Sequence, residues 1–212
     1  MEKKLLLEHN GETVEITHVT SDTHIGHRNI AKYTGRPYEN KESTAEMDSD
    51  LINKWNDVVP VDGTVLHLGD AALGQITESV KWYGSAHGRK FLVPGNHDYV
   101  SRIFSETRRE TYAPVYAEFF TVLPEMINLV AVRGDERVVI RASHYPTEAD
   151  HRERNKLSEL RPPKDGMKLI HGHTHYKEWE NSDFPLEFHV GVEAHNLAPI
   201  SAERIVDWVF SD

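Results

Sequence analysis

The chain has 212 residues, of which 38% are hydrophobic and 27% charged, and its formal net charge is −10 with neutral histidines. This composition predicts one globular domain over residues 1–212, with no membrane span and no export signal. The lack of cysteine excludes disulfides and thiolate chemistry, and the negative charge argues against stable binding of duplex nucleic acid.

The N-terminal part of the chain predicts strands, an irregular stretch and then a helix. Asn10-Gly11 between two alternating apolar runs predicts a hairpin, whose second strand covers 13–20. Residues 25–40 show no regular pattern. A helix is expected over 43–56, where Ser43 and Glu46 have the spacing of a capping box. The residues expected to face the core from this helix are Met47, Leu51, Ile52 and Trp55.

The middle and the end of the chain alternate between strands and helices. Strands are expected at 64–68, 91–93, 119–122, 167–170 and 186–192, a second hairpin at 126–132 and 137–142, and helices at 75–83 and 100–109. Ser201 is expected to cap a last helix, with Ile205, Trp208 and Val209 facing inward. Residues 145–166 form a long polar connection.

Residues of the types that bind metals follow five of the predicted strands, each where the strand ends. The five sets are Asp22-Thr23-His24, Gly69-Asp70, Gly95-Asn96-His97-Asp98, His144 and Gly172-His173-Thr174-His175. Each set alone is also typical of a turn, but five such sets in the same position rarely arise by chance. Because open α/β sheets bind ligands at the carboxyl ends of their strands, the pattern predicts a site there.

The order and the residues of these blocks resemble those of the calcineurin-like metallophosphoesterase superfamily, with its D-x-H, G-D, G-N-H-D, H and G-H-x-H motifs. The resemblance runs from Ser21 to His175. The segments 21–29 and 190–201 further resemble small bacterial and phage phosphodiesterases. The resemblance implies an α/β (α+β) fold, a four-layer αββα sandwich of two mixed β-sheets flanked by helices.

Carried over residue by residue, the resemblance implies two metal ions. The implied ligands are Asp22, His24, Asp70 and His175 for one ion, and Asp70, Asn96, His144 and His173 for the other. Asp70 would bridge the two ions together with a water or hydroxide, since a carboxylate can offer one oxygen to each of two cations about 3.5–4 Å apart. Asn96 would add a neutral oxygen ligand.

The implied reaction is hydrolysis at phosphorus by a metal-bound hydroxide. His97 is the implied catalytic acid for the leaving group, and Asp98 is expected to orient the His97 ring and raise its basicity. The alternative is that His97 only supports the site. For eight further residues the sequence leaves two alternatives open, contact with the substrate or a merely solvated or structural position. These residues are His27, Arg28, Asn29, Arg152, Arg154, Arg161, His195 and Asn196. His67 is expected in the core or behind the ligands, and no ligand role is expected for His171.

The sequence favours a small phosphodiesterase. Ser/Thr protein phosphatases of the superfamily carry G-D-x-V-D-R-G and G-N-H-E, whereas residues 71–74 contain no arginine and the third block ends in Asp98. We therefore expect hydrolysis of small, nucleotide-like phosphodiesters such as 2′,3′- or 3′,5′-cyclic nucleotides. The alternatives are a phosphomonoesterase or single-strand nuclease of the same superfamily and, more remotely, a non-catalytic protein-binding scaffold.

The expected cofactors are two divalent or trivalent metal ions, with Mn²⁺ as the first choice and Fe, Zn²⁺ or Ni²⁺ as alternatives, because oxygen and imidazole ligands suit all of them. The expected partner is the small phosphodiester substrate, with no membrane and no stable duplex nucleic acid. The expected location is the cytoplasm of a bacterial cell or of a phage-infected host. The sequence does not define an oligomeric state.

Overall fold

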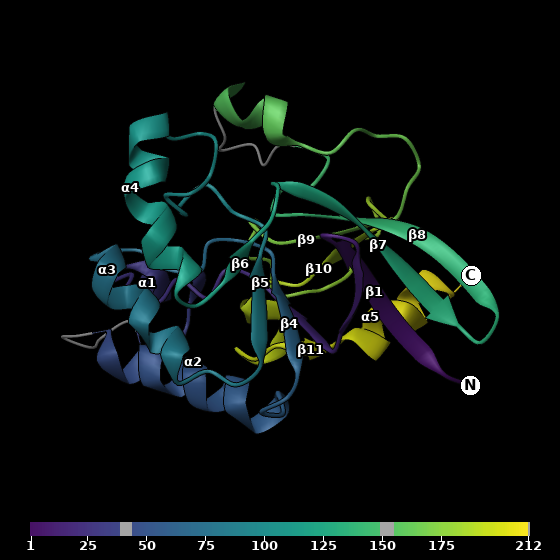
Figure 1. The fold of residues 1–212 in the computed structure, drawn as a ribbon, viewed down its shortest axis with the longest axis horizontal. Helices are drawn as coiled ribbons and strands as arrows, with labels where there is room; N and C mark the ends of the chain where they lie inside the picture. Colours follow the sequence, from purple (N-terminus) through teal and green to yellow (C-terminus); the bar gives the residue numbers. More distant parts are fainter. Residues whose placement is uncertain (39–43, 149–154, 212) are drawn as a thin grey trace.

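A computed structural model gives the fold and describes residues 1–38, 44–148 and 155–211. Within these ranges the chain forms two mixed β-sheets with helices around them (Figure 1). The predicted fold class, two mixed sheets flanked by helices, is confirmed. The predicted cap Ser43 and the loop residues His151, Arg152 and Arg154 lie outside the described residues.

The six-stranded sheet has the strand order β10-β9-β8-β7-β1-β2. Its strands are β1 (Lys3–His9), β2 (Glu12–Ile16), β7 (Met126–Arg133), β8 (Glu136–Ser143), β9 (Leu169–His171) and β10 (Glu187–His189). Both predicted hairpins, β1–β2 and β7–β8, are confirmed as antiparallel pairs. β8, β9 and β10 run parallel, so their carboxyl ends lie at one edge of the sheet.

The five-stranded sheet has the order β11-β3-β4-β5-β6. Its strands are β3 (His18–Thr20), β4 (Thr64–His67), β5 (Arg89–Leu92), β6 (Thr121–Val122) and β11 (Ile200–Ser201). β3 to β6 run parallel, whereas β11 is antiparallel to β3. The segments that follow β3, β4 and β5 are therefore brought together at the same edge.

The strand predicted over 13–20 is two strands in two different sheets. β2 ends at Ile16 and β3 begins at His18, so the chain changes sheet at Thr17. The Thr17 hydroxyl donates to the Thr64 carbonyl and accepts from the Thr64 amide, both at 2.9 Å. The polarity pattern slips by one residue at this crossing, where Thr17 and His18 are both polar, but so short an interruption does not by itself predict a change of sheet.

The helices are α1 (Ile30–Thr34), α2 (Ala45–Val58), α3 (Ile76–Ser79), α4 (Glu106–Ala117) and α5 (Ala202–Val209), with 3₁₀ helices η1 (Val80–Gly84), η2 (Asn155–Leu160) and η3 (Val192–His195). The four residues expected to face the core from α2 are buried, as are the three from α5. Val65 of β4 packs with α1, α2 and α4, whereas its neighbour Leu66 packs into the core that contains both sheets. α5 lies against β1 and β7.

Three helix predictions need correction. The stretch 25–40, expected to be irregular, contains α1. The helix expected over 75–83 is the short α3, which continues as the tighter η1. The prediction of a helix over 100–109 is wrong, because α4 begins at Glu106. This helix continues beyond Pro114, a residue that normally interrupts helices.

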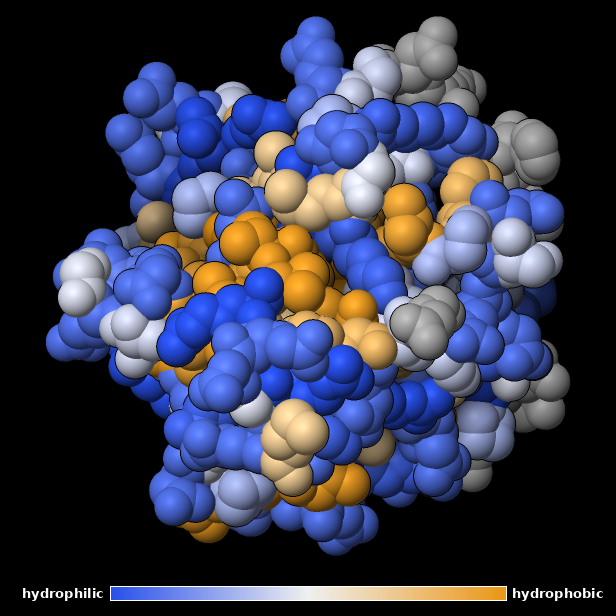
Figure 2. Space-filling view, turned by 90° about the vertical axis from the view of Figure 1, so that its right-hand side faces the viewer, coloured by the Kyte–Doolittle hydropathy of each residue, from blue (hydrophilic) through white to orange (hydrophobic). Residues whose placement is uncertain are grey.

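Both chain ends lie on one side of the molecule (Figure 1). Figure 2 shows this side, where apolar residues gather in a central area bordered by polar ones. Across the described ranges, every helix is too short or too polar to cross a membrane.

Candidate metal centre

The five predicted blocks meet where carboxyl ends of the two sheets adjoin. β3, β4 and β5 lead into the blocks of Asp22, Asp70 and Asn96, and β8 and β9 lead into those of His144 and His173. Among the described residues, two groups of side chains could each hold a metal ion, with ligand atoms within 4.8 Å of one another. The first group is Asp22, His24 and His175, and the second group is Asp70, His144 and His173.

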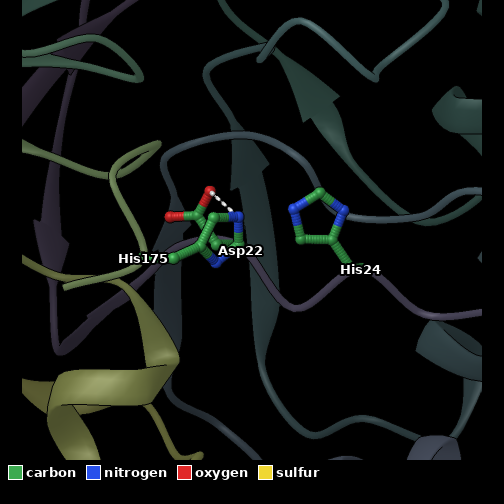
Figure 3. Close-up of side chains that lie close together, drawn as sticks. All are labelled: Asp22, His24 and His175. Atoms are coloured by element: carbon green, nitrogen blue, oxygen red, sulfur yellow. Dashed lines mark ion pairs between the residues drawn. The ribbon is translucent and has the colours of Figure 1, made fainter. Parts of the chain in front are cut away.

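In the first group, Asp22 and His175 face each other and His24 lies beside them (Figure 3). An Asp22 carboxylate oxygen is 4.0 Å from His175 Nε2, and the His24 and His175 rings stack with centroids 5.0 Å apart. Both His24 ring nitrogens are buried without a hydrogen-bond partner among the described residues. Because an unpaired buried nitrogen is costly, this donor set fits a cation.

The second group contains the carboxylate that also reaches the first. Asp70 Oδ2 lies 3.5 Å from His24 Nε2 and 3.5 Å from His144 Nε2. His144 Nδ1 donates to the Leu68 carbonyl at 2.7 Å, so its Nε2 lone pair faces the site. This Nε2 is 3.2 Å from Asn96 Oδ1 and 3.1 Å from His173 Nδ1. Electron-rich atoms that converge in this way suit a bound metal ion.

Burial is the main cause of the pKa shifts of three candidate ligands. It raises the pKa of the Asp22 carboxyl and lowers the pKa of the His24 and His173 rings. Neutral imidazoles are the form that binds metals. A bound cation would in turn favour the charged form of Asp22.

The backbone at the site is strained. Of the eight non-glycine residues with positive φ in the described part of the chain, five are candidate ligands: Asp22, His24, Asp70, His173 and His175. Each such residue costs on the order of 1–3 kcal/mol and persists only where its surroundings hold it. A concentration of strained residues of this kind is typical of a functional site.

Two glycines of the motifs are required by close packing. A Cβ at Gly172 would lie 2.0 Å from Ser21 Oγ and 2.5 Å from Asp22 Oδ2. A Cβ at Gly95 would lie 2.3 Å from Asp70 Oδ1. The glycines that precede the ligands therefore leave room for the carboxylates of neighbouring strands.

His97 and Asp98 occupy different environments. The His97 side chain is 40% exposed, and its Nε2 is 3.9 Å from Asp70 Oδ2. Asp98 is buried and accepts hydrogen bonds from the amides of Gly95, Asp70 and Ala71 at 2.8, 2.7 and 3.1 Å. Burial raises its pKa to about 6. In the described ranges no hydrogen bond joins Asp98 to the His97 ring, so the expected orienting contact is corrected: Asp98 ties the Asp70 and Gly95 loops together.

Two charged residues at the site had no signal in the sequence. Arg36 and Glu193 form a buried ion pair of 2.6 Å, and Glu193 Oε1 lies 3.2 Å from His175 Nδ1. Although burial opposes it, His175 and Arg36 lower the pKa of Glu193 to about 2. Likewise, against the effect of burial, Glu193 and Asp22 raise the pKa of His175 to about 9. Each is a single charged residue outside the motifs, so only the folded chain reveals the contact.

Other predicted residues have varied positions. His27 lines the cavity of about 650 Å³ that also contains His24, His97 and His175. His67 is buried in the core, 2.8 Å from the Thr23 hydroxyl. Arg28 lines a neighbouring cavity, and His195 is buried beside the His189 carbonyl. Arg161 donates a hydrogen bond to the Pro146 carbonyl.

The chain is similar to known proteins over most of its length. The family described as calcineurin-like phosphoesterase matches residues 17–177. The Gene 66 protein of Mycobacterium phage L5 is 30% identical over 199 residues, which cover 91% of this chain and 93% of that protein. The Gene 66 protein of phage D29 is 28% identical over 194 residues, covering 87% and 92%.

A shorter match and a solved structure agree with this result. The uncharacterized protein MJ1445 of Methanocaldococcus jannaschii is 37% identical over 83 residues, or 38% of this chain and 46% of that protein. The crystal structure of AQ665 from Aquifex aeolicus, a protein of unknown function, superposes with a TM-score of 0.62 and 25% identity, covering 91% of this chain and 98% of that one.

The family match defines the class of the chain as a metal-dependent phosphoesterase, and the paired candidate ligand groups at the strand ends of the two sheets fit that class. The chain belongs to the calcineurin-like phosphoesterase family. The resemblance seen in the sequence is therefore confirmed, and the phage relatives agree with the expected likeness to small phage members.

Proposed function

We propose that the chain is a two-metal phosphodiesterase that acts on small, nucleotide-like phosphodiesters. The observation that carries this proposal is the position of Asp70, whose Oδ2 is 3.5 Å from a histidine of each ligand group. A carboxylate between two groups of ligands can bridge two ions.

In this proposal each residue has a defined role. Asp22, His24 and His175 would hold the first ion, Asn96, His144 and His173 would hold the second, and Asp70 would contribute to both. When bound, two such ions supply a nucleophilic hydroxide and neutralise the phosphate oxygens. Mn²⁺ is the proposed ion, with Fe, Zn²⁺ or Ni²⁺ as alternatives.

His97 is the proposed proton donor to the leaving oxygen. Its ring lines the same cavity as His24 and His173, and its exposed side chain can reach a substrate there. Asp98 does not touch the reacting atoms in this proposal. It accepts hydrogen bonds from the amides of Asp70 and Gly95 and so fixes two loops. One loop carries the metal ligand Asp70, and the other carries His97.

A second cavity supports a nucleotide-like substrate. It measures about 120 Å³ and shares Thr174 and Tyr176 with the metal-side cavity. Its lining includes the aromatic rings of Trp179 and Phe184 and several carboxylates, among them the exposed Glu178 and Glu180. Aromatic faces beside hydrogen-bond acceptors suit a base that carries amino groups.

The test is hydrolysis of bis(p-nitrophenyl) phosphate by chelator-treated protein with and without added Mn²⁺, followed by a panel of cyclic nucleotides. We expect activity that depends on added metal and favours cyclic nucleotides. Faster hydrolysis of p-nitrophenyl phosphate than of the diester would favour the phosphomonoesterase alternative. Metal binding without hydrolysis of any phosphoester would refute the proposed function.

A further inference from the structure

One buried guanidinium supports the backbone of the first ligand group. Arg36 follows α1 and is 3% exposed. Its Nη2 donates to the Asp22 carbonyl at 2.7 Å, and its Nη1 donates to the Thr23 carbonyl at 2.9 Å. These carbonyls belong to the turn in which Asp22 and His24 both have positive φ. Arg36 therefore holds a strained turn in place.

The same guanidinium reaches the third ligand of the group through Glu193. Arg36 Nε and Nη2 donate to Glu193 Oε1 at 2.9 and 2.6 Å. This oxygen is also 3.2 Å from His175 Nδ1, while Nε2 of that ring faces Asp22. The side chains of Arg36 and Glu193 are only 1% and 3% exposed, so water screens the contact little.

An imidazole whose far nitrogen faces a carboxylate is held in one orientation and is a stronger metal ligand. The second ligand group is supported differently, because His144 Nδ1 donates to the neutral carbonyl of Leu68. The His175 Nδ1 contact with Glu193 at 3.2 Å is instead an ion-pair contact, and a buried carboxylate attracts a ring N–H more strongly than a neutral carbonyl does. The two ligand groups are thus chemically unequal.

We propose that Arg36 and Glu193 are positioning residues that make the site of Asp22, His24 and His175 the tighter of two metal sites. This inference rests on the proposed two-metal function. Arg36 fixes the turn that carries two of the ligands, and Glu193 fixes the ring of the third. The first site therefore keeps its ion at metal concentrations that empty the second.

The test is calorimetric titration of the chelator-treated protein with Mn²⁺, for the wild type and for Glu193→Gln. The wild type is expected to show two classes of site. Glu193→Gln is expected to weaken the tighter class by about 10–100-fold and to leave the weaker class within about threefold. Glu136→Gln, in the exposed ion pair with Arg133, is the matched control and is expected to change neither class.

Several outcomes would overturn the inference. The first is two wild-type sites of equal affinity, and the second is an unchanged affinity of the tighter class in folded Glu193→Gln. The third is equal weakening of both classes, because this result indicates that Glu193 has a merely structural role. If circular dichroism shows that Glu193→Gln is unfolded, Glu193→Asp replaces it, because it keeps the charge and lengthens the 3.2 Å contact to His175. A wild type that binds none of Mn²⁺, Fe, Zn²⁺ and Ni²⁺ would refute the proposed function instead.

Discussion

His97 combines exposure with closeness to the shared carboxylate. Its side chain is 40% exposed, although its amide donates to Asp70 Oδ1 at 2.8 Å. The backbone of His97 is thus fixed while its ring is accessible to a substrate. This combination suits a group that transfers a proton to a leaving oxygen.

His97→Ala is expected to lower kcat by about 10²–10⁴-fold while the metal content stays unchanged. The loss should be larger for substrates with poor leaving groups than for nitrophenyl esters, because only the former need a proton. Turnover of both substrate types and metal analysis check this. His27→Ala, in the same cavity, is the control and should preserve the dependence on the leaving group. Equal losses on both substrate types would count against proton donation by His97.

His67 gives the stability a dependence on pH. Burial lowers its pKa to about 3, whereas an unfolded histidine has a pKa of about 6.5. Between these values the unfolded chain binds a proton that the folded chain does not, so the free energy of unfolding falls as the pH drops below about 6.5.

His67→Gln is therefore expected to flatten the plot of unfolding free energy against pH. Between pH 4 and 6 its slope should decrease by up to about 1.4 kcal/mol per pH unit. Urea unfolding in the presence of a chelator measures this without a contribution from metal release. An unchanged slope would show that His67 is protonated in the folded chain.

At the scale of elements, α2 packs against the five-stranded sheet and helps to form the core on that side. Trp55 of this helix is 1% exposed, stacks near His67 and donates from Nε1 to the His87 carbonyl at 3.0 Å. The helix thus contributes a large buried side chain without contributing a metal ligand.

Trp55→Ala is expected to lower the free energy of unfolding by about 3–5 kcal/mol, since it leaves a cavity and an unpaired carbonyl. Val58→Ala at the end of the same helix is the control, because Val58 is 43% exposed, and should stay within about 0.5 kcal/mol of the wild type. Urea denaturation measures both variants. A small effect of Trp55→Ala would mean that α2 is only loosely attached to the sheet.

The sequence predicted elements where a local pattern decides the structure. The hairpin at Asn10-Gly11 follows from the positive φ of both residues, and the core residues of α2 follow from helical spacing. The sheet change at Thr17 and the extent of α4 beyond Pro114 depend on tertiary packing, which no local pattern records.

In the site, too, the sequence predicts what a local pattern decides and not what depends on tertiary packing. The candidate ligands could be predicted because each follows a strand, and parallel strands place their ends together. The role of Asp98 could not be predicted, because proximity in sequence does not give the direction of a side chain. Arg36 and Glu193 meet only in the folded chain.

At the scale of the whole molecule, metal and stability are linked. Buried carboxylates and a net charge of −10 mean that bound cations relieve repulsion in the folded state. At a free concentration of 100 times Kd, an ion that binds only the folded chain adds about 2.7 kcal/mol per site.

Thermal unfolding in Mn²⁺ is therefore expected to give a higher Tm than unfolding in a chelator. Asp70→Ala should abolish most of this difference, because Asp70 lies between both ligand groups. Asp207→Ala, which removes an exposed ion pair with Lys3, should retain it. A full metal-dependent shift in Asp70→Ala would refute the shared role of Asp70.

The meeting of two sheets at the ligands also bears on the order of folding. Asp22 follows β3 of one sheet and His175 follows β9 of the other, and the two residues are far apart in the chain. Contacts between distant segments form slowly. The first ligand group exists only once both sheets have docked, so metal capture during refolding marks the completion of the fold rather than its beginning.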